Sequence, residues 1–187
     1  MKYLAAIFLA VQLCVPSVAE APGDAGREYQ DAKTALAKIL ASEAKEKTGL
    51  MARITELETL DADLYRAAVK EPHRRKELFL QMARNKLEVL RAAIRMYFID
   101  NSAYPPDLKK LTPKYVQAIP EVAVMPGPAS GRVYVLDKDV YGRDLYDAVG
   151  HTNGGWLYVS DKNSPRWGDV YINSDRITIE GKYAYQY

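Results

Sequence analysis

The stretch from Leu90 to Pro106 reads Leu90-Arg91-Ala92-Ala93-Ile94-Arg95-Met96-Tyr97-Phe98-Ile99-Asp100-Asn101-Ser102-Ala103-Tyr104-Pro105-Pro106. As far as Asp100 it contains neither glycine nor proline, and it is rich in residues that favour helix. Tyr104-Pro105-Pro106 must end that helix, because a proline lacks the N–H group and moves the residue before it away from helical angles. The stretch therefore predicts the end of a helix and the start of an extended or turning segment.

This helix is expected to run back to about Pro72, since proline suits the first position of a helix. An apolar stripe recurs along it with helical spacing, and charged residues occupy the opposite flank. The stripe consists of Leu80, Ala83, Leu87, Leu90, Ile94 and Phe98. Burying a Leu or Ile side chain contributes about 1.5–3 kcal/mol, so this helix is expected to be the spine of the domain.

Residues 27–70 form a second helical segment, with no proline and a single glycine, Gly49. One stripe carries Leu50, Ile54, Leu57, Leu64 and Ala68, and Asp61 interrupts it. The pattern is typical of a packing or coiled-coil face. Because Glu71-Pro72 follows, the long helix is expected to be broken near Pro72.

The C-terminal part is expected to be a small sheet. Segments rich in β-branched and aromatic residues occur at 132–135, 155–159, 169–172 and 176–179. Turn-forming residues at Asn153-Gly154 and at 161–165 imply antiparallel connections. The sequence thus predicts an α+β fold, in which a long N-terminal helix packs on a small antiparallel β-sheet.

Residues 1–21 have the pattern of a secretory signal peptide, with Lys2 before an apolar run that is too short to span a bilayer. Cleavage is expected after Ala19 or Ala21, which predicts an exported protein of the periplasm or cell surface. Cys14 is the single cysteine and lies in this segment, so the mature chain is expected to form no disulfide. A lipoprotein site at Cys14 is the alternative, which the bulky Leu13 disfavours. The expected organisation is 1–21 signal peptide, 22–71 helical extension or docking arm, and 72–187 α+β domain.

Charge and motifs exclude several classes of function. The chain has 26 basic and 24 acidic residues, so its composition does not imply a nucleic-acid partner. No dinucleotide-binding, P-loop or zinc-protease motif occurs, and no nucleophile stands in a strand–turn–helix elbow. The sequence therefore predicts a protein that is not an enzyme, with no cofactor and no transmembrane span in the mature chain.

Three further sequence features follow the stretch at 90–106 in order. They are Ile119-Pro120, then Gly154-Gly155-Trp156-Leu157-Tyr158, then Gly168-Asp169-Val170-Tyr171-Ile172-Asn173. Together, over about residues 78–187, they resemble the globular domain of type IV pilins and of type II secretion pseudopilins, major pseudopilins above all. In that family the C-terminal half of a long helix packs on a small antiparallel sheet, and the N-terminal half anchors in the membrane and then forms the filament core.

The resemblance stops at the N-terminus. The corresponding segment here, 27–73, is charged and cannot sit in a bilayer. The family's processing motif, a Gly followed by Phe and then a Glu shortly after the cut, is also absent. The resemblance therefore implies a pilin-like domain without the usual membrane anchor.

The resemblance implies a non-catalytic protein that acts through protein–protein contacts, accessory to type II secretion or type IV pilus assembly. Its partners would be pilin or pseudopilin subunits, with the helix 27–70 as docking arm. The alternative is an exported module that binds glycan or peptide on an aromatic sheet surface, with Trp156 and Trp167 as candidates. A purely structural role for these aromatics, with Trp156 at the centre of a sheet face packed on the helix, is favoured over that alternative.

Calcium is the one cofactor that the resemblance brings into question, because major pseudopilins bind it in their C-terminal loops. Asp161, Asn163 and Asp169 surround an expected turn and could supply oxygen ligands. Asp and Asn are also the commonest turn formers. The family's calcium-loop sequence is not present at these positions, so they are weak calcium candidates.

Overall fold

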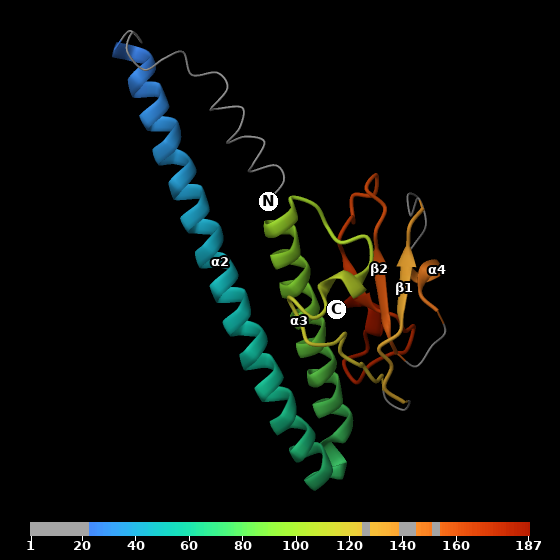
Figure 1. The fold of residues 1–187 in the computed structure, drawn as a ribbon. Coiled ribbons are helices and arrows are strands. Elements are labelled where there is room, and N and C mark those ends of the chain that lie inside the picture. Colours follow the sequence, from blue (N-terminus) through green and yellow to red (C-terminus); the bar gives the residue numbers. More distant parts are fainter. Residues whose placement is uncertain (1–22, 125–127, 139–144, 151–153) are drawn as a thin grey trace. The chain divides into compact units, whose positions relative to one another are not determined.

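The computed structural model describes residues 23–124, 128–138, 145–150 and 154–187 (Figure 1). The expected signal peptide, with Cys14 and both cleavage sites, lies outside the described residues. The chain divides into two compact units, residues 1–48 and residues 49–187. Residues 49–70, which the sequence assigns to the helical extension, thus lie in the same unit as residues 72–187.

Two helices form a hairpin within the second unit. Helix α2 (Gly23–Lys70) contributes its part from Gly49 onward, and helix α3 (Arg75–Asn101) runs back alongside it. Between them, Glu71 leaves the helical conformation and Pro72 opens the 3-10 turn η1 (Pro72–Arg74). The break expected near Pro72 is therefore confirmed. Figure 1 shows α3 between the later part of α2 and the sheet.

The end of α3 also agrees with the sequence. Ser102 adopts a left-handed conformation with φ 53°, and its N–H donates to the Phe98 carbonyl oxygen at 2.7 Å. This closes the last turn of the helix. Tyr104-Pro105-Pro106 then leads into the 3-10 turn η2 (Leu108–Leu111), where the Asp107 side chain accepts from the Lys109 N–H at 2.9 Å.

The sheet has three strands in the order β1-β2-β3, namely β1 (Val133–Leu136), β2 (Trp156–Val159) and β3 (Val170–Ile172). Strands β2 and β3 are antiparallel, with Trp156 opposite Ile172. Strands β1 and β2 are parallel, with Val133 opposite Trp156. The prediction of an antiparallel sheet is wrong for this pair, and the sheet is mixed. Parallel neighbours need a crossover, and the connection between them contains the short helix α4 (Leu145–Ala148).

The strand expected at 176–179 is also absent. Only Ile177 pairs there, in a single bridge to Tyr183, before the 3-10 turn η3 (Ala184–Gln186). Ile177 and Ile179 are exposed. Because the segment has no neighbouring strand along its length, its β-branched residues do not extend the sheet.

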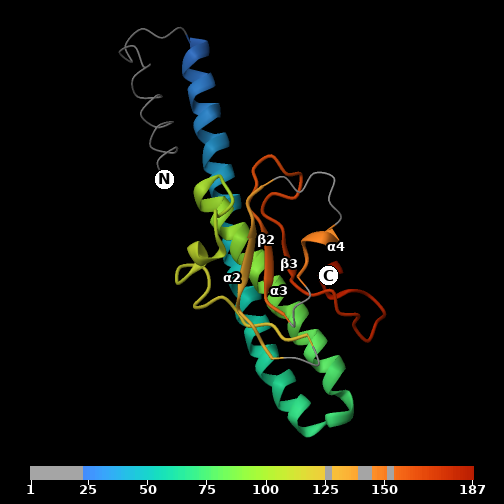
Figure 2. The ribbon, with the colours of Figure 1, turned by 90° about the vertical axis from the view of Figure 1, so that its right-hand side faces the viewer.

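Helix α3 is buried on two faces, which makes it the centre of the core. Ala83, Leu87, Leu90 and Ile94 of the expected stripe are buried, while Leu80 and Phe98 are half-buried. A second face is buried as well, and its members are Leu78, Met82, Val89, Ala92 and Met96. Figure 2 shows the strands in front of α3, on the side away from the later part of α2. The fold is thus α+β, with a long bent helical segment packed on a small mixed sheet.

Candidate functional site

The seam between the two helices follows a heptad repeat. On α2 its members are Leu50, Ile54, Leu57, Asp61, Leu64 and Ala68, and on α3 they are Leu78, Met82, Asn85, Val89, Ala92 and Met96. Each set alternates steps of four and three residues, the spacing of a coiled coil. Leu64, Ala68, Leu78 and Met82 form one buried cluster across the seam. The α2 stripe expected from the sequence is therefore confirmed as a helix-packing face, whereas the α3 half of the seam was not predicted.

One polar pair stands in the middle of this seam. The Asn85 Nδ2 donates to the Asp61 Oδ1 at 3.0 Å, and both side chains are half-buried. Burial raises the pKa of the Asp61 carboxyl, and the Asn85 hydrogen bond partly offsets this rise. A polar pair at these positions favours one alignment of the two helices, because a shift by one heptad would set each group against an apolar side chain. Asp61, which looks like a defect in the stripe, therefore has a partner.

The features that carry the family resemblance touch one another. The Trp156 Nε1 donates to the Pro120 carbonyl oxygen at 2.7 Å, and the Tyr158 hydroxyl donates to the Pro105 carbonyl oxygen at 2.6 Å. Both side chains are completely buried, and burial raises the pKa of Tyr158 well above its usual range. Two completely buried side chains of strand β2 thus donate hydrogen bonds to two proline-containing loops.

Gly168 makes a third contact between these distant sequence features, by close packing against the Tyr104 ring. Its φ is +92°, and a Cβ at this position would lie 2.6 Å from the Tyr104 ring. Only glycine fits both the backbone conformation and the close approach of the ring. The Tyr-Pro-Pro segment and the Gly-Asp-Val segment, far apart in the sequence, are therefore packed face to face.

The two tryptophans have different environments. Trp156 has an exposed fraction of 0% and belongs to the main core cluster with α3, so it offers no surface to a ligand. Its role is the structural one that the sequence favours. Trp167 is half-buried and packs edge-on against Tyr104, with ring centroids 5.1 Å apart. Tyr104 in turn contacts Phe98 at the end of α3. An aromatic ligand platform would therefore have to rest on Trp167 without Trp156.

The calcium candidates are engaged in turn formation. Asp161 is buried and its Oδ1 accepts from the Asn163 N–H at 2.9 Å, as in an Asx turn. The exposed Asp169 accepts from the Tyr171 hydroxyl at 2.8 Å, and burial together with this bond raises the pKa of Tyr171 to about 12. Within the described ranges, no group of three or more His, Cys, Asp or Glu side chains is arranged to hold a metal ion. Calcium binding stays a prediction.

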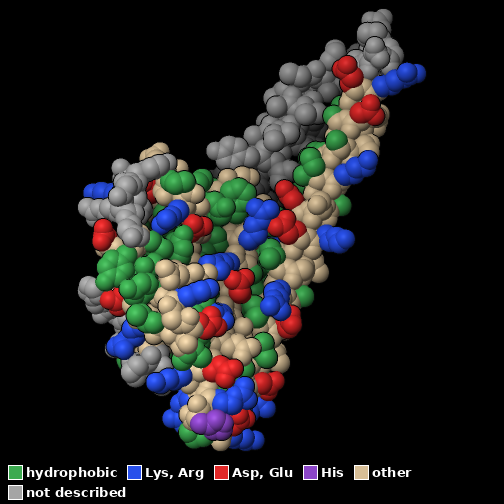
Figure 3. All heavy atoms as spheres, turned by 180° about the vertical axis from the view of Figure 1, so that it is seen from behind, with side chains coloured by type: hydrophobic (Ala, Val, Ile, Leu, Met, Phe, Trp, Pro, Cys, Tyr) green, Lys and Arg blue, Asp and Glu red, His purple; other side chains and the backbone are tan. Residues whose placement is uncertain are grey.

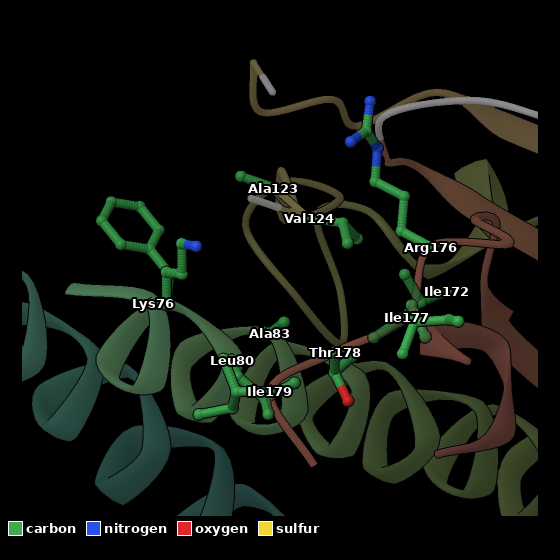
Figure 4. A pocket seen from close by; sticks show the side chains of 12 residues that line it. Lys76, Leu80, Ala83, Ala123, Val124, Ile172, Arg176, Ile177, Thr178 and Ile179 are labelled. Carbon is green, nitrogen blue, oxygen red and sulfur yellow. The ribbon is translucent and has the colours of Figure 1, made fainter. Parts of the chain in front are cut away.

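An open groove lies between the first half of α3 and the segment after β3 (Figure 4). Its volume is about 370 Å³. Its lining is mostly apolar, with Leu80, Ala83 and Ile179 at the floor, while Lys76 and Arg176 stand at opposite sides. The polar side chains among the described lining residues are Lys76, Arg176 and Thr178, and none of these lining residues has a carboxylate. Most of the surface of the groove therefore offers apolar contacts.

The part of α2 in the first unit carries large apolar side chains in contact with solvent. Tyr29, Ile39 and Leu40 have exposed fractions of 48%, 56% and 41%. Acidic and basic residues are interspersed around them along the helix. On the face of the molecule in Figure 3, charges of both signs are interspersed without a large patch of one sign. Exposed apolar residues on a charged helix are typical of a surface that binds another helix.

Comparison with protein-family models, with curated proteins and with solved structures gave no match to this chain. Among the helices that the structure describes, none combines the length and hydropathy needed to cross a bilayer. The geometry defines an α+β protein with a helical hairpin, a small mixed sheet and exposed apolar side chains on α2.

Proposed function

We propose that this chain is an exported, non-catalytic, pilin-like protein that acts through protein–protein contacts, accessory to type II secretion or type IV pilus assembly. Its docking element is α2, and its partners are pilin or pseudopilin subunits. The observation that carries the proposal is the set of exposed apolar side chains on α2 before Thr48, with Ile39 and Leu40 adjacent. Such side chains cost free energy in water unless a partner covers them.

The domain at 78–187 supports the pilin-like part of the proposal. Its four sequence features keep the order that suggested the family, and they contact one another through Trp156, Tyr158 and Gly168. The export part rests on the sequence of residues 1–21 alone. The non-catalytic part rests on the lack of any recognisable catalytic motif in the sequence.

Binding of the purified mature chain to purified pilin and pseudopilin subunits of the same cell tests the proposal. We expect measurable binding by biolayer interferometry and its loss in the double variant I39E/L40E, which places two charges on the docking face. The matched control is Ile179→Glu, because Ile179 is similarly exposed but lies after β3. Lack of binding to every subunit, or equal binding by I39E/L40E, would overturn the proposal.

A further inference from the structure

The heptad spacing of the α2 seam continues toward the N-terminus in the same phase. Counting back from Leu50 in alternate steps of three and four gives Lys47, Glu43, Leu40, Leu36, Lys33 and Tyr29. All of them lie in the helical part of the first unit. Leu40 is exposed and Leu36 half-buried. The first unit therefore has its own coiled-coil stripe, with two leucines at its centre.

The charges of this stripe are arranged symmetrically about the leucines. Lys33 lies three residues before Leu36, and Glu43 lies three residues after Leu40. In an antiparallel pair of two such helices, Leu36 of one copy faces Leu40 of the other. Lys33 then faces Glu43 at both ends of the leucine pair, which is attractive. In a parallel pair, Lys33 would face Lys33 and Glu43 would face Glu43. The stripe is therefore complementary to itself in one orientation only.

The residues that border the stripe permit close approach. Ala32, Ala37 and Ala44 flank it with small side chains, and Ile39 adds an exposed apolar side chain at its edge. The distance between two packed helices depends on the side chains at the contact, and small ones let the backbones come near. None of these four flanking residues carries a charge that would repel a second copy.

From this self-complementarity we propose that residues 29–47 form an antiparallel coiled-coil dimer with a second copy of this chain. The interface is isologous, so each Lys33–Glu43 pair occurs twice. The inference deepens the proposed function, because it rests on the same docking helix and names a second copy as one of its partners.

Sedimentation equilibrium of the mature chain at roughly 1 µM to 1 mM is the first test. We expect a reversible dimer. Lys33→Glu and Glu43→Lys each convert two attractive pairs into two like-charged pairs, which should weaken the dimer about tenfold. The double variant K33E/E43K exchanges the charges and should restore the affinity to within about threefold. Lys38→Glu, with the same charge change outside the stripe, is the matched control and should leave the affinity unchanged.

Orientation is tested with a spin label on Thr48→Cys, since Thr48 is exposed and the mature chain has no other cysteine. In the antiparallel dimer the two labelled positions lie about 20 residues apart along the helix axis, or about 30 Å. In a parallel dimer they would be adjacent. Circular dichroism of every variant checks that α2 stays helical.

A chain that remains monomeric at every concentration overturns the inference, as does a dimer that K33E/E43K fails to restore or whose labels are adjacent. These outcomes are separate from those of the proposed function. A monomer that still binds pilin subunits removes the dimer and keeps the proposed function. A dimer that binds no pilin subunit keeps the dimer and overturns the proposed function.

Discussion

The polar pair in the helix seam allows a sharp test of the fold. Replacing both members by leucine, in D61L/N85L, turns the seam into an uninterrupted apolar heptad face. Full burial of a leucine contributes about 1.5–3 kcal/mol. Because Asp61 and Asn85 are half-buried, we count about half of that for each leucine. The lost hydrogen bond costs about 0.5–1.5 kcal/mol. The double variant should therefore be at least as stable as the wild type, with a gain of about 0–2.5 kcal/mol.

The single variant Asp61→Leu should gain less, because it leaves the half-buried Asn85 amide without its acceptor. The free energy of unfolding is measured by urea titration followed by circular dichroism, with all variants at one pH. A double variant that is less stable than the wild type would contradict the coiled-coil interpretation of the seam. So would a single variant that is more stable than the double.

The pH dependence gives the same pair a second readout. Burial raises the pKa of Asp61 in the folded chain, so the folded state holds this proton more tightly than the unfolded state. The resulting stabilisation is fully present below the ordinary aspartate pKa of about 3.9 and is lost as the pH rises through the raised value. In the variant Asp61→Asn, the side chain at position 61 has no carboxyl group and takes up no proton in this pH range. The stability of the wild type minus that of D61N should therefore fall as the pH increases through this window, and a flat difference between pH 3 and pH 7 would contradict burial of Asp61.

Further predictions concern the sheet and its loops. Tyr158→Phe removes the hydroxyl that donates to the Pro105 carbonyl oxygen and should lower the free energy of unfolding by about 1–3 kcal/mol in urea titration, whereas Tyr65→Phe, at an exposed position, should change it little. Gly168→Ala should cost about 2–4 kcal/mol, because its φ is positive and its Cβ would meet the Tyr104 ring; an unchanged melting temperature would refute this. If calcium binds at Asp161, Asn163 and Asp169, adding the ion should raise the melting temperature, and Asp169→Asn should reduce that rise; no response to calcium would remove the candidate site.

Much of the helical architecture could be predicted from the sequence, because it depends on local patterns. The break at Pro72 follows from the missing N–H of proline, and the end of α3 follows from Tyr104-Pro105-Pro106. The α2 stripe from Leu50 to Ala68 is visible in its spacing alone. The matching stripe on α3, from Leu78 through Asn85 to Met96, has the same spacing and could have been found by searching for a second heptad phase.

The sheet was predicted less well, for a physical reason. The sequence of a strand records which residues favour extended backbone, but its neighbours are chosen by contacts between distant segments. Val133 to Leu136 therefore reads as a strand without revealing that it runs parallel to β2. Residues 176–179 have the composition of a strand, yet no segment pairs with them beyond one bridge.

For the candidate sites too, the sequence suggests which residues matter, and the packing shows the environment of each. Trp156 and Trp167 look alike in the sequence, and only the packing shows that one is completely buried against α3 while the other stays half-buried beside Tyr104. Asp61 looks like an interruption until Asn85 is placed opposite it.

The helices, their break near Pro72 and the heptad spacing of α2 can be inferred from sequence patterns, because hydrogen bonding and side-chain periodicity within a helix involve residues at most a few positions apart. The mixed sheet, the pairing of Asp61 with Asn85, and the contacts of Trp156, Tyr158 and Gly168 with loops far away in the chain are visible only in the folded structure. Those features depend on which distant surfaces meet, and that is decided by the packing of the whole core.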